Sequence, residues 1–514
     1  DGGPVVGVQL ENEYGGPAEH LLTLKALARE LGLDVPLYTR TGWPALKTPL
    51  RFGEIVPLYG VYAEGFWDRE TTAMPGSYWA GFHFSTLRTD ANIANEALGR
   101  RDVRDAPDVA RYPYLACEIG GGMMSSYHRR ILVDPRDITS TTLVKLGSGS
   151  VSPGYYMYHG GLNPEGRRTT LMESQDTAIT NWNDLPVKNY DFQAPLGAYG
   201  QVRPHYAGLR RLHTFLHHFG DRLADTGTAL PDARPTGKDD TATLRWSVRG
   251  DARGGFLFVN NHERGRTLPA KPEVQFQVTF ADRGPLTLPT APITVPPDAH
   301  FIWPLNLDLG EGGTLAWATA QPLAVIGEGR NATWYFFATP GVPAEFVFRG
   351  TRVVARRGTT EISGDGTTRV LHVTPGREPA LILNSSIRVV LLDEADSLAF
   401  APDAATGTVR FDEPAAPPVT PVAATLLRPA GQARPITLGR APKPVAAAPG
   451  DADFAAAAVW RIALPADLDL AANPLLRLRY TGDVARVFVG GRLIVDDFYN
   501  GAPLEIGLAR YAEA

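Results

Sequence analysis

Two kinds of hydrophobic pattern alternate over about the first 220 residues of this 514-residue chain. Short apolar runs that end in polar residues predict β-strands, and stretches with apolar residues three or four positions apart predict helices. Strands are expected over residues 5–10, 35–40, 54–62, 112–118 and 154–163. Helices are expected over residues 18–32, 92–104, 136–149 and 203–219. Strands that alternate with helices predict βα units and a parallel sheet, hence an α/β architecture.

The first strand carries the clearest signal. Val5, Val6, Val8 and Leu10 form a β-branched apolar run, which predicts a strand buried on both faces. The polar residues that end it, with Asn12 and Glu13 among them, fall at the carboxyl end of a predicted parallel strand, where α/β folds place their active sites.

A different pattern begins near residue 221. Runs such as 243–248, 255–260 and 274–280 alternate apolar and polar residues between Gly, Pro and Asp turns, which predicts antiparallel β structure. We therefore expect an α/β domain over 1–220 and an antiparallel β domain over 221–412. A Pro/Ala-rich stretch, 413–421, is typical of a linker. Residues 422–514 predict a truncated β-sandwich-like module of the jelly-roll kind.

Net charge, hydropathy and cysteine content argue against some classes of function but do not indicate a particular one. The formal net charge is 50 − 55 = −5, which gives no indication of nucleic acid as a partner. No apolar stretch reaches the roughly 18 residues of a membrane span. Cys117 is the single cysteine, and no Cys/His spacing indicates zinc, so we expect neither a metal nor a cofactor. The chain starts at Asp1 with no initiator Met or signal peptide, and we expect a fragment cut at both ends.

Several motifs resemble glycoside hydrolase family 35, the β-galactosidase family. Residues 2–15, GGPVVGVQLENEYG, resemble the family's acid/base strand, which is the fourth strand of a TIM (β/α)8 barrel. Residues 156–163 resemble its strand-eight segment, and residues 189–196 resemble its Tyr-Asp-Tyr-Asp-Ala-Pro-Leu segment. The resemblance implies that residues 1–220 are strands four to eight of such a barrel, followed by the family's β modules.

Glycoside hydrolysis requires two carboxyl groups flanking the scissile bond. Glu13 is one candidate, and Glu118, 118 − 13 = 105 residues later, also ends an apolar strand. The resemblance implies that Glu13 is the acid/base, that Glu118 is the nucleophile on strand seven, and that Asn12 bonds the sugar 2-hydroxyl. Tyr62 and Tyr190 are further candidates for binding the sugar. The alternative for Glu118 is a rim carboxylate, or a partner of a nearby cation such as Arg129 or Arg130.

Some residues depart from the family pattern. Phe192 replaces the second Tyr of the Tyr-Asp-Tyr-Asp segment, and Gln193 replaces the Asp after it, so a sugar-facing hydroxyl is expected to be missing. The motifs therefore indicate a retaining β-glycosidase more firmly than a galactosidase. Trp43 and Trp67 follow strands and fit either a sugar platform or loop packing. Structural hydrogen bonds are expected for His128, His159 and His205, and packing is expected for Cys117.

The predicted function is a retaining exo-β-glycosidase, most similar to a β-galactosidase, with a terminal β-linked sugar as its carbohydrate substrate. One alternative is a transglycosylase, which uses the same two Glu but a sugar acceptor, and product analysis at raised acceptor concentration separates the two. Another is a non-catalytic carbohydrate-binding relative, in which Glu118→Gln would leave turnover unchanged. The resemblance favours an extracytoplasmic or periplasmic location, and the sequence indicates no particular oligomeric state.

Overall fold

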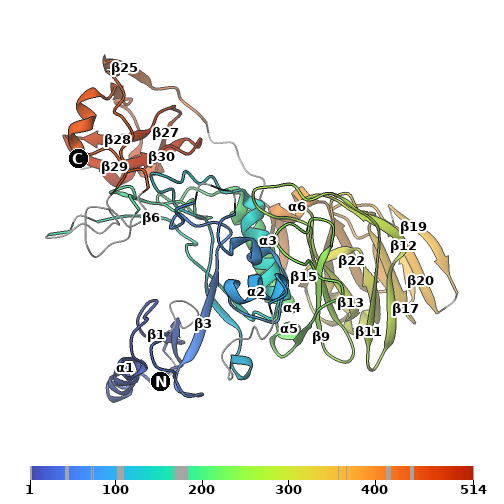
Figure 1. The fold of residues 1–514 in the computed structure, drawn as a ribbon. Helices are drawn as coiled ribbons and strands as arrows, with labels where there is room; N and C mark the ends of the chain where they lie inside the picture. Colours follow the sequence, from blue (N-terminus) through green and yellow to red (C-terminus); the bar gives the residue numbers. More distant parts are fainter. Residues whose placement is uncertain are drawn as a thin grey trace.

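A computed structural model describes most of the chain, and a five-stranded parallel sheet forms its first part (Figure 1). The described residues are 3–40, 46–70, 72, 74–100, 109–164, 166–167, 183–356, 358–365, 367–403, 405–412, 418–439 and 445–512. Neighbouring strands follow one another in chain order, and all four pairings are parallel. The strands are β1 (Val8–Gln9), β2 (Leu37–Arg40), β3 (Val56–Val61), β4 (Leu115–Ile119) and β5 (Ser152–Tyr155).

The first strand differs from its prediction. β1 covers only Val8–Gln9, and it stands at the edge of the sheet with β2 as its neighbour. Val5 and Val6 precede it and are 55% and 83% exposed. The expectation of a strand buried on both faces is therefore wrong. An apolar run shows that a segment favours extended structure, but burial on both faces also requires other elements packed above and below the sheet, which the run itself does not specify.

Two further boundaries differ from the prediction. Helix α2 spans Asp90–Ala97, so it begins before residue 92 and ends well before 104, because Gly99 adopts the left-handed φ of +71° that terminates helices. Residues 101–104 of the predicted helix lie outside the described residues. The expected strand 154–163 is divided into β5 and the short β6 (Gly161–Leu162), which pairs antiparallel with β7 (Asn189–Tyr190).

The other three predicted helices are confirmed as α1 (Ala18–Glu30), α3 (Pro135–Gly147) and α4 (Pro204–Phe219). The start of α3 is fixed by Asp134, whose carboxylate accepts the backbone N–H of Arg136 at 2.8 Å, and by Pro135 in the first turn. Two short helices, α5 (Asp221–Ala224) and α6 (Glu394–Ala399), complete the set. Within the described ranges, no helix is long and apolar enough to cross a membrane.

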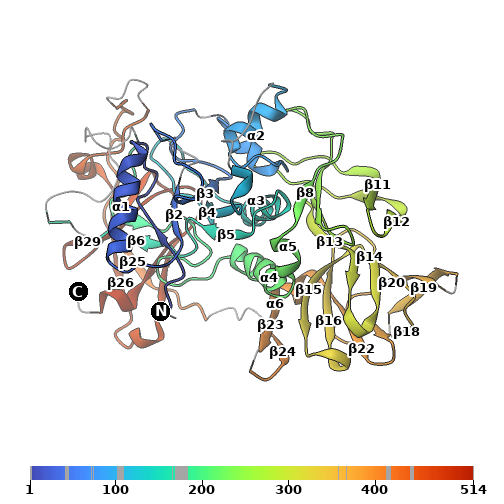
Figure 2. The same cartoon turned by 90° about the horizontal axis from the view of Figure 1, so that it is seen from below.

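Helices α3 and α4 join the parallel sheet to a large β domain (Figure 2). Leu143 and Val144 of α3, with Phe215 and Phe219 of α4, share one buried apolar cluster with Phe256 and other side chains of the β domain. Burial of apolar area at roughly 25 cal/mol per Å² makes this shared core the main contribution to the attachment of the two parts.

The β domain contains two larger sheets and two ribbons. Its pairings are antiparallel as expected, except that β16 and β22 run parallel. The eight-stranded sheet has the order β19 (Thr359–Gly364), β20 (Thr368–Val373), β17 (Glu345–Arg349), β14 (Thr314–Ala318), β13 (His300–Asp308), β10 (Gly255–Asn260), β9 (Arg245–Gly250) and β8 (Gly227–Ala229). The five-stranded sheet has the order β15 (Ala320–Ile326), β16 (Thr333–Ala338), β22 (Ile387–Leu392), β21 (Leu381–Leu383) and β18 (Val353–Ala355). The ribbons are β11 (Lys271–Phe280) with β12 (Gly284–Val295), and β23 (Phe400–Asp403) with β24 (Thr408–Phe411).

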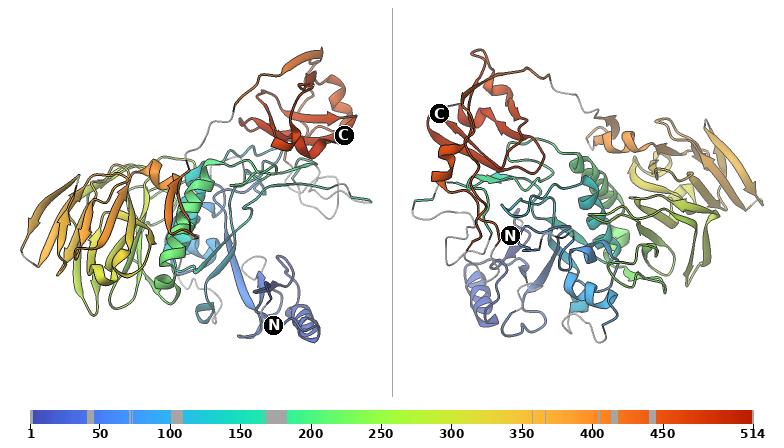
Figure 3. Two further views of the ribbon diagram at one scale, coloured as in Figure 1. Left: turned by 180° about the vertical axis from the view of Figure 1, so that it is seen from behind. Right: turned by 45° about the horizontal axis from the view of Figure 1, so that its top comes forward.

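The last part of the chain, here called the C-terminal module (residues 418–439 and 445–512), lies against the parallel-sheet part, away from the β domain (Figure 3). Residues 413–417 of the predicted linker lie outside the described residues. Three antiparallel pairs form the module: β25 (Ala423–Arg428) with β26 (Val459–Ala463), β27 (Leu475–Leu478) with β30 (Leu504–Gly507), and β28 (Val484–Val489) with β29 (Arg492–Phe498).

Candidate active site

Glu118 lies in β4, an inner strand of the parallel sheet, and is 8% exposed. The hydroxyl of Tyr62, the residue that follows β3, donates a hydrogen bond of 2.9 Å to its Oε2. Burial, followed by the charge of Glu118, raises the pKa of Tyr62 well above its ordinary value. The phenol therefore keeps its proton and remains a donor, so it holds the orientation of this carboxylate.

Neither arginine of the rim-carboxylate alternative pairs with Glu118. Arg129 forms its ion pair with Glu64 at 2.9 Å, and Arg130 pairs with Asp483 at 2.8 Å. The alternative reading of Glu118 as a partner of these two arginines is thus wrong, and its carboxylate accepts from Tyr62 instead.

Glu13 lies three strands away in the sheet order, beyond the end of β1. Its side chain is partly exposed, and its φ of +48° places it in the left-handed region. Glu11 has a φ of +56° and pairs with His20 of α1 at 2.7 Å. A non-glycine residue with positive φ is uncommon, and such backbone strain tends to collect at functional sites.

Arg40 interacts electrostatically with both carboxylates, and no sequence pattern predicted it. It is fully buried at the end of β2, and its Nη1 donates to the carbonyl of Leu58 at 3.2 Å. Burial lowers the pKa of this guanidinium, while the charges of Glu118, Cys117 and Glu13 act in the opposite direction. Both glutamates also act on Tyr62. The charges of Glu13 and Glu118 therefore both act on Arg40 and on Tyr62.

A signal for Arg40 was present in the sequence. It occupies the carboxyl end of a predicted strand, the position on which the choice of Glu13 and Glu118 depended. The sequence pattern does not single out a lone arginine there, because glycoside hydrolysis is expected to depend on two carboxyl groups and not on a cation.

The other predicted sugar-binding residues occupy different environments. Asn12 is exposed, and its Oδ1 accepts a 3.3 Å hydrogen bond from Gln9. Tyr190 belongs to β7, and its hydroxyl lies 2.6 Å from that of Tyr156. It packs in the apolar cluster that also holds Tyr62. Tyr190 therefore stands on the Glu118 side of the site, whereas Asn12 stands beside Glu13.

Aromatic rings surround Tyr62. Trp67 is partly exposed, with its ring centroid 5.2 Å from that of Tyr62, so it lies next to the candidate site. Phe192 is buried against Phe66 and Tyr190, and the hydroxyl missing from it would enter this apolar cluster. Trp43 lies outside the described residues.

The histidines and the cysteine make structural contacts. His128 lies 2.6 Å from the carbonyl of Asp68, His159 lies 2.6 Å from that of Gly160, and His205 lies 3.0 Å from that of Gln193. Cys117 donates to the carbonyl of Tyr59 at 3.6 Å, and burial raises the pKa of its thiol to about 12. No cluster of three or more His, Cys, Asp or Glu suited to a metal occurs in the described ranges.

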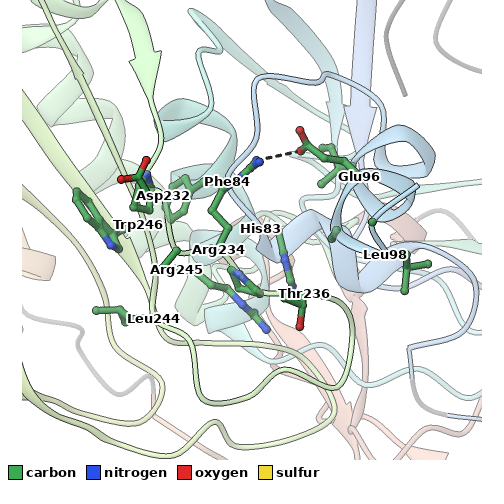
Figure 4. Close-up of a pocket in the computed structure, with 16 residues that line it drawn as sticks. His83, Phe84, Glu96, Leu98, Asp232, Arg234, Thr236, Leu244, Arg245 and Trp246 are labelled. Atoms are coloured by element: carbon green, nitrogen blue, oxygen red, sulfur yellow. Dashed lines mark ion pairs between the residues drawn. The ribbon is translucent and has the colours of Figure 1, made fainter. Parts of the chain in front are cut away.

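A cavity of about 440 Å³ lies elsewhere, between α2 and the chain that leads into β9 (Figure 4). His83, Arg245 and Trp246 line it, and Arg234 pairs with Glu96 across it at 3.3 Å. Neither Glu13 nor Glu118 is among its lining residues. Glycoside chemistry requires two carboxyl groups, and this cavity holds neither of the predicted ones, so we place the candidate active site at Glu13 and Glu118.

Comparison with known proteins covers the parallel-sheet part of the chain. The family model of glycosyl hydrolases family 35 matches residues 1–216. Beta-galactosidase 17 of Arabidopsis thaliana is 31% identical over 220 residues, which is 41% of this chain and 27% of that protein. Beta-galactosidase 8 of Oryza sativa subsp. japonica is 30% identical over 220 residues, 41% of this chain and 28% of that protein. The aligned region thus spans about a quarter of these relatives.

A solved structure, Gamma-CGTASE from Alkalophilic bacillus clarkii, covers 72% of this chain and 55% of its own at 12% identity, with a TM-score of 0.27 that is too low to show a shared fold. The sequence matches are more informative, because they fall on the segment that carries Glu13, Tyr62, Glu118 and Tyr190. Residues 1–216 are accordingly similar to glycosyl hydrolases family 35.

Proposed function

We propose that the protein is a retaining exo-β-glycosidase that removes terminal β-linked sugars, with a β-galactoside as the favoured substrate. The observation that carries this proposal is the carboxylate pair itself. Glu13 and Glu118 follow or end parallel strands three apart in one sheet, and both act on the same buried arginine. We further propose that the five strands are strands four to eight of a (β/α)8 barrel, whose active sites form at this end of the strands.

The proposed first step is glycosylation of the enzyme. A carboxylate oxygen of Glu118 attacks the anomeric carbon, the bond from that carbon to the leaving oxygen breaks, and Glu13 gives its proton to this oxygen. Tyr62 supports the role of Glu118 as nucleophile, because its hydrogen bond leaves the other carboxylate oxygen, Oε1, for attack. Asn12 is assigned to the sugar 2-hydroxyl, and Tyr190 is assigned to the sugar ring.

The proposed second step releases the sugar. Glu13, now ionised, takes a proton from water, the water oxygen attacks the anomeric carbon, and the ester bond to Glu118 breaks with the electron pair returning to its carboxylate. Arg40 supports this step, since a cation within reach of both glutamates stabilises whichever of them is charged. Retention requires the two carboxyl groups to be about 5–5.5 Å apart in the working enzyme.

Covalent trapping tests the proposal. The full chain is incubated with 2-deoxy-2-fluoro-β-galactosyl fluoride, and the labelled peptide is identified by mass spectrometry. A label on Glu118 that is absent in Glu118→Gln supports the nucleophile, retention and the galacto configuration together. A label from the gluco analogue alone would contradict the choice of sugar, and absence of both labels would contradict the covalent mechanism.

A further inference from the structure

The C-terminal module lies outside the family match, yet it contacts the two segments nearest to Glu118 and Tyr190 (Figures 1 and 3). One is residues 120–134, which directly follow β4, the strand of Glu118, and are called the nucleophile loop. The other is residues 183–190, which end in Tyr190 and are called the Tyr190 segment. Polar contacts from the module reach both segments.

Asp483 fixes the nucleophile loop from outside. Its carboxylate accepts a 2.7 Å hydrogen bond from the Tyr127 hydroxyl and pairs with Arg130 at 2.8 Å. Asn500 adds a third contact, because its side-chain amide donates to the carbonyl of Ile131 at 2.8 Å. The outer half of the loop is therefore held by side chains of the module.

Asp496 fixes the Tyr190 segment. This residue of β29 is 2% exposed. Its carboxylate accepts the backbone N–H groups of Val187, Lys188 and Asn189 at 2.6, 2.7 and 3.2 Å. Three consecutive N–H groups directed at one carboxylate fix the backbone immediately before Tyr190, since hydrogen bonds to a charged acceptor are the strong ones.

The two segments are also joined to each other. The side-chain amide of Gln193 donates to the carbonyls of Met123 and Ile131 at 2.7 and 2.9 Å and accepts the N–H of Val133 at 3.1 Å. Gly122 lies so close to the neighbouring backbone that a Cβ there would be 2.1 Å from the carbonyl oxygen of Phe192. A displacement of one segment therefore moves the other.

We propose that Asp496 and Asp483 are positioning residues of the active site: Asp496 sets the place of Tyr190, and Asp483 sets the place of the nucleophile loop. This inference rests on the proposed function, because it takes Tyr190 as a sugar contact and Glu118 as the nucleophile. It gives the C-terminal module a role in catalysis, whereas the β domain is attached through the large apolar core of α3 and α4.

A double-mutant cycle tests the part of Asp496. Asp496→Asn has nearly the same shape, but it replaces one acceptor oxygen with an NH2 group that faces backbone N–H donors. We expect kcat/KM to fall about tenfold, mainly through a higher KM, as loss of a charged hydrogen bond predicts. Tyr190→Phe should lower kcat/KM as well. If Asp496 acts through Tyr190, adding Asp496→Asn to Tyr190→Phe should change kcat/KM less than twofold further.

Two further variants complete the design. Asp469→Asn is the matched control, because this exposed Asp of the same module caps a short turn at Ala471, and its kinetics should equal those of the wild type. Asp483→Asn, at an Asp whose side chain is 57% exposed, keeps the inference testable if Asp496→Asn does not fold. It should lower kcat and slow fluorosugar labelling of Glu118, with KM changed less.

The outcomes are distinguishable from those of the proposed function. Additive effects of Asp496→Asn and Tyr190→Phe, or wild-type kinetics in both Asp variants, would overturn the inference while an active wild type still supports the function. If the wild type turns over no β-glycoside, the function is wrong. Hydrogen exchange then decides the inference: faster exchange at the amides of 187–190 in Asp496→Asn supports the ordering role, and unchanged exchange overturns it.

Discussion

The two candidate carboxylates occupy contrasting surroundings. Glu118 is buried in an inner strand and accepts a hydrogen bond from Tyr62, whereas Glu13 is partly exposed beyond an edge strand in a left-handed conformation. The contrast fits the division of labour proposed for them. A nucleophile must be held in line with the anomeric carbon, while an acid/base must exchange protons with water and the leaving group. Under the proposed mechanism, the different surroundings would give these identical side chains different chemistry.

The largest expected effect on kcat comes from removing the carboxylate of Glu118. Glu118→Gln should lower kcat by roughly 10⁴-fold or more, the range seen when the nucleophile of a catalytic unit is lost. Because no covalent intermediate can then form, the loss should be similar for good and poor leaving groups. Steady-state rates with a series of nitrophenyl glycosides measure this, and a loss that vanishes with the best leaving group would assign Glu118 to the acid instead.

The second largest effect is expected for Glu13, and its dependence on the leaving group should distinguish Glu13 from Glu118. Glu13→Gln should lower kcat about 10²–10⁴-fold for substrates with poor leaving groups, the usual contribution of general acid catalysis. Glycosylation by dinitrophenyl glycosides should be nearly unchanged, since their leaving group needs no proton. Pre-steady-state bursts compare the two substrates. Equal losses for both would remove the distinction between the two glutamates.

Removing the Tyr62 hydroxyl should affect catalysis through Glu118 and not through Glu13. Tyr62→Phe keeps the ring in its apolar cluster but removes the donor to Glu118, and we expect kcat to fall roughly tenfold or more, since a hydrogen bond to a charged group contributes about 1.5–3 kcal/mol. Tyr78→Phe, in a neighbouring ring of the same cluster, is the matched control. Equal kinetics of the two variants would contradict the orienting role.

Replacing Arg40 tests the electrostatic link between the carboxylates. Arg40→Met removes a buried cation but keeps most of its volume, so ionising a nearby carboxylate becomes less favourable. The acid limb of the pH profile of kcat/KM should therefore move to higher pH by about one unit, the lower end of the effect of an adjacent arginine. An unchanged acid limb, measured with a nitrophenyl glycoside in the same buffers, would show that Arg40 is too well screened to matter.

The last prediction concerns the free energy of unfolding rather than turnover. Burial lowers the pKa of His205 to about 4, below the 6.5 of the unfolded chain, so the unfolded state binds the extra proton between these values. The stabilisation is complete above pH 6.5 and is lost as the pH falls to 4, by at most about 3 kcal/mol. Thermal unfolding of His205→Gln should depend less on pH in this window. His217→Gln, on the exposed side of the same helix, should follow the wild type.

Local patterns predicted the elements that depend on local forces. The sequence predicted the helices over 18–32, 136–149 and 203–219 and the position of Glu118 at a strand end. Such features can be predicted because amphipathic periodicity and strand ends depend on only a few neighbouring residues. The edge position of β1 was not readable, since it depends on which strand lies beside it. The burial of Arg40 and its proximity to both carboxylates likewise arise from the order of the strands.

Sequence patterns could not predict the contacts between segments that are far apart in the chain. Asp496 meets residues more than 300 positions earlier, and nothing in its neighbourhood distinguishes it from Asp497. Gln193 was noticed only as a departure from the family pattern. Its amide supplies two donors and an acceptor to the nucleophile loop, which a carboxylate could not do.

The buried charges near α3 determine where this chain can be divided. Arg264 of the β domain pairs with Glu64 and with Asp137, and His262 also contacts Asp137 at 2.9 Å. A protein cut at residue 216, where the family match ends, would leave Asp137 without Arg264 and His262, whereas Glu64 would keep Arg129. Such an uncompensated buried charge typically costs 3–5 kcal/mol, a large part of the stability of a domain. The segment that matches the family therefore depends on the β domain for the charge partners of Asp137.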